Sequence, residues 1–184
     1  FLGVDGMPRR IYTYPAGFEG GRSAGFQEYK GCVLTGLEEL YFGGWAMFSS
    51  NWLWSNPPMD STGTKLQYIY LRHSGTGAFA RSGFSVAIDK SALGGPHFQF
   101  SWQPNFGVGT KNYAFNSCTG CSNPIITRGV WHWFEVRIKL NTATADPLAY
   151  SSDGILELWL DGVKVASHTH IAFRDVSAYT FYTY

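Results

Sequence analysis

Residues 129–140 read GVWHWFEVRIKL, and apolar residues recur there at every second position. One alternating set is mostly apolar and comprises Val130, His132, Phe134, Val136, Ile138 and Leu140. The other set comprises Trp131, Trp133, Glu135, Arg137 and Lys139. A period of two is typical of a β-strand with one buried and one open face. We therefore expect a long, half-buried strand across this segment.

A second alternating run, residues 154–165, contains the dipeptide Asp161-Gly162. Asp-Gly between alternating apolar runs is typical of the two-residue turn of a β-hairpin. The turn predicts three cross-strand pairs: Leu160 with Val163, Leu158 with Val165, and Trp159 with Lys164. The last of these would be a cation–π pair on the open face. The segment as a whole predicts antiparallel sheet.

The composition extends this prediction to the whole chain. Of its 184 residues, 17% are aromatic and 22 are glycine, whereas only 15% are charged. Many aromatic residues and glycines with few helix-forming residues favour an all-β sandwich, and the length suits a single domain over residues 1–184. We expect the Gly-rich residues 1–37 to be irregular and to wrap a sheet edge. Further strands are expected at Glu39–Ser49, Lys65–Arg72, Gly83–Asp89 and His97–Gln103.

Charge and cysteine content exclude several classes of partner. A net charge of +1 without a basic run argues against nucleic acid, and no apolar run is long enough for a membrane span. Cys118 and Cys121 lie in a loop-like segment, where we favour a small disulfide over free thiols or a metal site. No metal site is expected from the cysteines. A disulfide would imply an extracellular or surface setting.

The same segments carry a family resemblance. Gly129-Val130-Trp131-His132, Leu140-Asn141-Thr142, Asp153-Gly154 and the run from Leu158 to Val163 resemble the concanavalin A-like lectin/glucanase jelly rolls. The laminin G-like and polysaccharide-lyase-like branches are the most similar. The resemblance covers roughly residues 38–184 and implies an antiparallel β-sandwich of two packed sheets, with a concave sheet that holds glycan. This fold hosts lectins, lyases, glycosidases and structural domains.

One predicted strand carries a row of neutral polar residues suited to sugar hydroxyls. His97, Gln99, Ser101 and Gln103 alternate with Phe98, Phe100 and Trp102. If the aromatic residues face the core, the polar residues stand on the opposite face at intervals of ~6.6–7 Å. The row is either an ordinary solvated face or a glycan-binding row. In the second case Tyr41 and Trp45 are candidates for stacking on pyranose rings.

The resemblance also implies candidate catalytic residues for a lyase. In jelly-roll lyases an Arg, Gln or Asn neutralises the uronate carboxylate, a His or Tyr removes the C5 proton, and a Tyr protonates the leaving oxygen. The residues that match these types here are His97, Gln99, Tyr68, Tyr70 and Arg72. The Gln-aliphatic-His motif of such lyases is absent, because His97-Phe98-Gln99 has the reverse order. The carboxylate run of the family's glycosidases is also absent.

Three functions remain open at this point. The main hypothesis is an extracellular polysaccharide-binding jelly-roll domain. The alternatives are a polysaccharide lyase acting on uronate glycans by β-elimination, and a structural or assembly domain of a virion or cell-surface array that binds other protein subunits. No cofactor is required by any of them, although Asp146 and Asp153 are candidate Ca²⁺ ligands in their loop.

Overall fold

The structure is a computed structural model, which describes residues 36–51, 64–73, 79–89, 97–104, 111–114 and 126–181. These described residues form strands and no helix. The strands are β1 (Glu39–Ala46), β2 (Thr64–His73), β3 (Phe79–Asp89), β4 (His97–Pro104), β5 (Lys111–Ala114), β6 (His132–Lys139), β7 (Gly154–Leu160), β8 (Val163–Ile171) and β9 (Tyr179–Phe181). The expected N-terminal segment up to residue 35 and the predicted Cys118–Cys121 disulfide lie outside the described residues.

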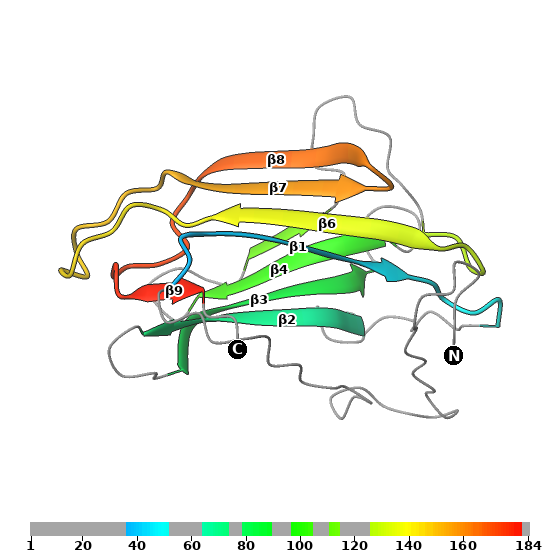
Figure 1. The fold of residues 1–184 in the computed structure, drawn as a ribbon, viewed down its shortest axis with the longest axis horizontal. Coiled ribbons are helices and arrows are strands. Elements are labelled where there is room, and N and C mark those ends of the chain that lie inside the picture. Colours follow the sequence, from blue (N-terminus) through cyan, green and yellow to red (C-terminus); the bar gives the residue numbers. More distant parts are fainter. Residues whose placement is uncertain are drawn as a thin grey trace. The chain divides into compact units, whose positions relative to one another are not determined.

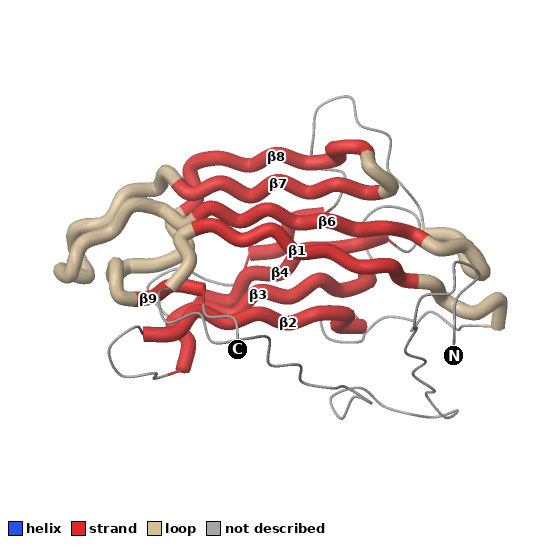
Figure 2. The backbone as a smooth tube through the Cα atoms, viewed as in Figure 1, coloured by secondary structure: helices blue, strands red, loops and turns tan. Residues whose placement is uncertain are grey.

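The strands form two antiparallel sheets (Figures 1 and 2). The four-stranded sheet has the order β1-β6-β7-β8, and the five-stranded sheet has the order β5-β4-β3-β2-β9. Leu37, just before β1, exchanges two main-chain hydrogen bonds of 2.9 and 3.0 Å with Phe181 of β9. The two sheets are therefore joined where the described chain begins and where it ends.

Aromatic residues from both sheets build one core. Phe98 and Phe100 of β4 are fully buried, and so are Val136 and Ile138 of β6. The ring centroids of Phe98 and Phe134 lie 5.4 Å apart, which places β4 and β6 against each other across the core. The predicted all-β, antiparallel fold is confirmed.

The predicted faces of β6 are confirmed over most of its length. From His132 to Leu140 the apolar set is buried and the alternate set is at least partly exposed. Val130 departs from the pattern, because it precedes the strand and is 45% exposed. Gly129, with φ of +75°, donates its N–H to the Phe48 carbonyl at 2.7 Å. Because of this turn at Gly129, the extended conformation of β6 begins only after Val130.

The predicted hairpin is correct at its turn and at the two pairs next to it, but wrong at the third pair. Asp161 and Gly162 have φ of 51° and 80°, as a type I′ turn requires. Two of the predicted pairs are present, Leu160 with Val163 and Trp159 with Lys164. The Lys164 ammonium lies 5.0 Å from the Trp159 ring centroid. Leu158, however, pairs with Ala166 instead of Val165, because the register shifts between Leu158 and Trp159, as in a β-bulge.

The remaining strand predictions need smaller corrections. In β1, Leu40, Phe42 and Ala46 pack against the core as predicted, but the strand ends at Ala46 and not at Ser49. β3 begins at Phe79, four residues before the predicted start. β5 was not among the predicted strands, because four residues are too few to show a period.

Candidate functional site

The face of the five-stranded sheet that points away from the core carries most of the predicted site residues. Phe98, Phe100 and Trp102 are buried in the core, so Gln99 and Ser101 belong to the opposite face of β4. Gln99 is 7% exposed and Ser101 is 5% exposed. The expectation of an open row is therefore wrong for these two residues, which are covered in this structure.

The Gln99 side chain carries a buried hydrogen-bond acceptor. Its Oε1 atom is buried and has no hydrogen-bond donor among the described residues. Buried carbonyl oxygens are nearly always hydrogen-bonded, because an unpaired one costs about 1–3 kcal/mol.

The register of the sheet places Tyr68 in one row with polar residues of three other strands. Ser101 pairs with Ser85 of β3 and with Asn112 of β5, and Ser85 pairs in turn with Tyr68 of β2. Residues that are directly opposite in an antiparallel ladder share a face. This row crosses β5, β4, β3 and β2. Ser85 and Asn112 were not among the predicted site residues.

The next row brings together two further predicted residues. Gln103 of β4 pairs with Gly83 of β3, and Gly83 pairs with Tyr70 of β2. Adjacent rows on one face are ~6.6–7 Å apart, about the length of one sugar unit. Glycine within a strand often marks a place where another group approaches the backbone. Tyr68, Tyr70 and the glycine between Tyr70 and Gln103 therefore belong to one compact part of this sheet.

The register separates the other two candidate catalytic residues. His97 pairs with Asp89 at one end of β4, six residues and roughly 20 Å from Gln103. Arg72 pairs with Phe79, one row beyond Tyr70 in the opposite direction. In the register of the sheet, His97 and Arg72 are therefore separated by several rows, whereas Tyr68, Tyr70 and Gln103 lie in neighbouring rows. Lys65, which pairs with Ala87 beside Gln99, is a cationic position that the sequence reasoning missed.

Tyr41 and Trp45 lie on the other sheet. Both belong to β1, and their side chains are 56% and 54% exposed on the outer face of the four-stranded sheet. They therefore share no site with the row on β4. The same outer face carries the predicted stripe of Trp133, Glu135 and Arg137 from β6.

Ion pairs neutralise the charges in the middle of this outer face. Arg137 binds Glu39 and Glu157 at 2.6 Å each, and Lys164 binds the second oxygen of Glu157 at 2.5 Å. Hydrogen bonds from Lys164 and Arg137 hold the pKa of Glu157 below its usual value. The hydrogen bond from Arg137 lowers the pKa of Glu39 in the same way. The charges of Arg137, Lys164, Glu39 and Glu157 are therefore paired within the protein.

The aromatic end of the outer face is open. The ring centroids of Trp45 and Trp133 lie 5.5 Å apart with their planes tilted by 55°. A cleft of about 390 Å³ is lined by these two residues together with Asp161 and Gly162. In Figure 1 the β7–β8 turn lies at the same end of the sheet as the end of β1. We refer to this place as the tryptophan cleft.

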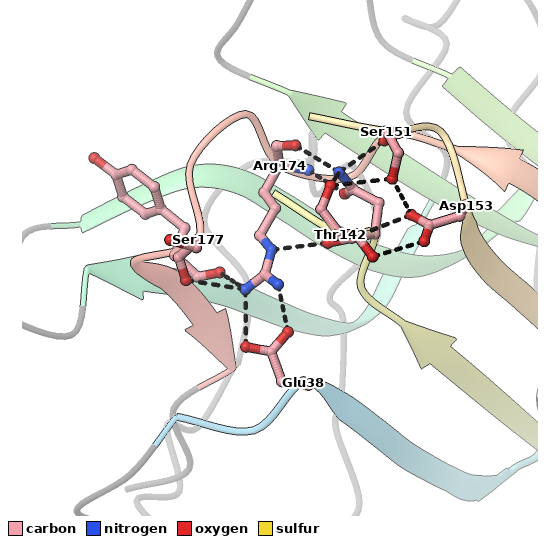
Figure 3. Close-up of polar contacts among 8 residues, drawn as sticks. Glu38, Thr142, Ser151, Asp153, Arg174 and Ser177 are labelled. Carbon is pink, nitrogen blue, oxygen red and sulfur yellow. Dashed lines mark hydrogen bonds and ion pairs between the residues drawn. The ribbon is translucent and has the colours of Figure 1, made fainter. Parts of the chain in front are cut away.

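The opposite end of the same sheet is tied together by a buried arginine (Figure 3). Arg174 is 4% exposed and donates to the carbonyl oxygens of Asn141, Ser177 and Tyr179 at 2.8–3.1 Å. It also forms an ion pair with Glu38. The Asn141 side chain is fully buried and exchanges hydrogen bonds with the Arg174 main chain. We call these residues the arginine cluster.

The candidate calcium ligands are bonded to protein donors. Asp153 accepts hydrogen bonds from the hydroxyl groups of Ser151 and Thr142 and from the Thr142 main chain (Figure 3). These bonds lower the pKa of Asp153 to about 2. Asp146 accepts from the Leu148 N–H at 2.9 Å. Within the described part of the chain, no three acidic, histidine or cysteine residues cluster as a metal site would require.

Comparison with known proteins gives a likeness in fold. No family model matches the chain, and no curated protein matches its sequence. The chain is similar in structure to alginate lyase Aly36B, with a TM-score of 0.52, 18% identity, and coverage of 78% of this chain and 56% of that one. A variant of Aly36B in complex with alginate tetrasaccharide matches with a TM-score of 0.53, 17% identity and the same coverage. Alginate lyase vAL-1 from Chlorella virus matches with a TM-score of 0.53, 14% identity, and coverage of 78% and 59%.

These likenesses establish the β-sandwich and nothing finer. The β-sandwich that the sequence resemblance implies agrees with these likenesses in fold. The chain spans a little over half the length of the lyases that it matches. Among the described residues there is no helix able to cross a membrane.

Proposed function

We propose that this chain belongs to a polysaccharide lyase that cleaves uronate-containing glycans by β-elimination, outside the cell or at its surface. The observation that carries the proposal is the likeness in fold to two alginate lyases over 78% of the chain. The five-stranded sheet adds support, because its register gathers Tyr68, Tyr70 and Gln103 on neighbouring rows. The proposal ranks the lyase above a purely glycan-binding domain.

The chemistry requires two proton transfers at one sugar unit. A base removes the C5 proton, the C–H electron pair forms the C4–C5 double bond, and the C4–O bond breaks as an acid protonates the leaving oxygen. Tyr68 and Tyr70 lie two residues apart on β2, a spacing of ~6.6–7 Å along the strand that allows both to reach one sugar unit. In our proposal these two tyrosines carry the transfers. Gly83 beside Tyr70 leaves room for the sugar over β3.

The carboxylate of the uronate needs a partner that withdraws its charge. Arg72 follows Tyr70 on β2, and Lys65 precedes Tyr68 on the same strand. Either cation makes the C5 proton more acidic when it binds the carboxylate. His97, at the far end of β4, would then contact a more distant unit of the polymer. In our proposal the reacting sugar lies over β2 and β3, because Gln99 and Ser101 of β4 are buried.

The proposal is tested by ultraviolet absorbance of the unsaturated product during incubation with alginate and with polyglucuronate. Wild-type protein is expected to raise the absorbance, and Tyr68→Phe or Tyr70→Phe to lower the rate by about 100-fold or more, as for loss of a general acid or base. Leu148→Ala is the matched control, because Leu148 is 91% exposed in a distant loop. Circular dichroism verifies that each variant is folded.

Two other outcomes would replace the proposal. No rise in absorbance, combined with retardation in native gels that contain alginate, identifies a polysaccharide-binding domain. No rise and no retardation, with a stable oligomer in solution, favours the structural or assembly role and a protein partner. Exposed aromatic residues on the outer face, such as Tyr41 and Trp45, are compatible with that last outcome.

A further inference from the structure

The tryptophan cleft depends on a glycine inside a strand. A Cβ atom at Gly43 of β1 would lie 2.5 Å from the Phe134 carbonyl oxygen and 3.1 Å from Cζ2 of Trp133. The Trp133 indole therefore lies across β1 at Gly43, where β1 has no side chain on this face. Glycine in a strand interior weakens the strand and marks such close approaches. The absence of a side chain at Gly43 therefore allows the position of the Trp133 ring.

Trp133 in turn supports an exposed ring. Trp45 contacts it with ring centroids 5.5 Å apart, yet Trp45 remains 54% exposed. Met47, two residues after Trp45, and Trp131, two residues before Trp133, are 42% and 39% exposed. The cleft beside the pair measures about 390 Å³, within the range of ~300–1,000 Å³ typical of small-molecule sites.

The carboxylate of Asp161 lines the cleft, and that of Glu135 binds the Trp133 ring beside it. Asp161 accepts the Trp133 main-chain N–H at 2.8 Å and binds Nδ1 of His132 at 2.9 Å. Glu135 accepts the Trp133 indole N–H at 3.4 Å. Each carboxylate oxygen has a further lone pair that can accept a sugar hydroxyl. The nearest row of cations is unavailable, because Arg137 and Lys164 are bound to Glu157.

This combination selects one class of ligand. The C–H face of a pyranose stacks on an exposed indole and removes apolar area from water. Carboxylates accept its hydroxyl groups and repel a uronate. We propose that Trp45, Trp133 and Asp161 form a binding site for neutral pyranose units, on the opposite sheet from the proposed lyase site. The site binds a different polysaccharide from the one that the five-stranded sheet cleaves.

The test is affinity electrophoresis of the whole chain in native gels that contain galactomannan, laminarin or hydroxyethylcellulose. We expect at least one of these neutral polymers to retard the wild-type protein. Trp45→Ala should weaken that binding by about tenfold or more, whereas Trp45→Phe should retain part of it. Tyr150→Ala is the control, because it removes a 40% exposed aromatic residue at the other end of the sheet.

Several results would overturn the site. Retardation by none of the neutral polymers, or equal retardation of Trp45→Ala and wild type, contradicts it. Self-association that Trp45→Ala abolishes, without glycan binding, would make the cleft a protein interface instead. Alginate cleavage is measured on the same variants, and Trp45→Ala is expected to leave it unchanged. The site and the proposed lyase function can therefore fail independently.

Discussion

Two clefts of similar volume lie at opposite ends of the four-stranded sheet. The cleft beside the arginine cluster measures about 340 Å³ and is lined by Glu38, Asn141, Arg174 and neighbouring residues. The tryptophan cleft measures about 390 Å³. In the first, the charged and amide groups are hydrogen-bonded to one another. In the tryptophan cleft, Trp45 is more than half exposed.

The difference shows that volume alone does not identify a binding site. Polar groups that already satisfy each other contribute stability and have little capacity left for a ligand. An exposed indole keeps apolar area in water, and a ligand that covers it gains binding free energy. We therefore assign stability to the arginine cluster and recognition to the tryptophan cleft. Each of the following changes tests that division.

The largest effect is expected at the arginine cluster. Arg174→Met would leave three carbonyl oxygens and Glu38 without their donor, and should lower the free energy of unfolding by about 3–4 kcal/mol. Lys139→Met, an exposed lysine at the same end, should change it by less than about 0.5 kcal/mol. Urea unfolding measures both. A loss below 1 kcal/mol for Arg174→Met would contradict a stabilising role.

Gly43→Val should destabilise the sheet at the end that carries the tryptophan cleft. The valine Cβ would meet the Phe134 carbonyl oxygen and Trp133, so we expect a loss of about 2–3 kcal/mol and a changed near-ultraviolet circular dichroism signal from the tryptophans. Gly44→Ala is the neighbouring control, because its nearest contact is the Phe134 ring at 3.3 Å. If both variants unfold alike, the close approach of Trp133 over Gly43 is not important.

Between the two ends, Glu157→Gln should cost about 2 kcal/mol at pH 7, because Arg137 and Lys164 lose a shared, nearly buried carboxylate. The pKa of Glu157 is lowered on folding, so its contribution is present above the usual value of 4.5 and is lost as the pH falls through the folded pKa. The difference in unfolding free energy between wild type and variant should therefore shrink on going from pH 7 to pH 3. A constant difference would show that charge is not the cause.

The smallest effect is expected in the loop next to the arginine cluster. Asp153→Asn replaces a carboxylate whose pKa is lowered to about 2 by hydrogen bonds from Ser151 and Thr142. The melting temperature should fall by roughly 2–4 °C at pH 6. Because the usual pKa of an aspartate is 3.8, wild type should lose this advantage as the pH falls from 4 towards 2. Equal melting temperatures at pH 6 would show that the carboxylate adds nothing to this loop.

The faces of the strands are the part of this fold that local sequence predicts best. Alternation in β6 identified Phe134, Val136 and Ile138 as core residues, because strand geometry itself imposes the period. Asp161-Gly162 identified its turn, because few residues adopt positive φ at low cost. The bulge after Leu158 has no such local signal, since it depends on how two strands fit together.

The candidate sites were less predictable, because they depend on which strands become neighbours. Alternation placed Gln99 on the correct face, but nothing local indicated that this face of β4 would be covered. The row from Tyr68 through Ser85 to Ser101 requires the register of three strands. Tyr41 and Trp45 were expected beside the β4 row and lie on the other sheet, because β1 pairs with β6 and not with a strand near it in sequence.

The pairing of β1 also has a consequence for how the chain is made. Arg137 and Glu39 are 98 residues apart in sequence, and Arg174 and Glu38 are 136 apart. During translation β1 therefore leaves the ribosome long before β6 exists to pair with it. Until β6 is synthesised, the apolar face of β1, with Leu40 and Phe42, is exposed and can pair with the wrong partner. We expect refolding on the millisecond-to-second scale of proteins dominated by distant contacts, and greater yields in cells when chaperones shield this first strand.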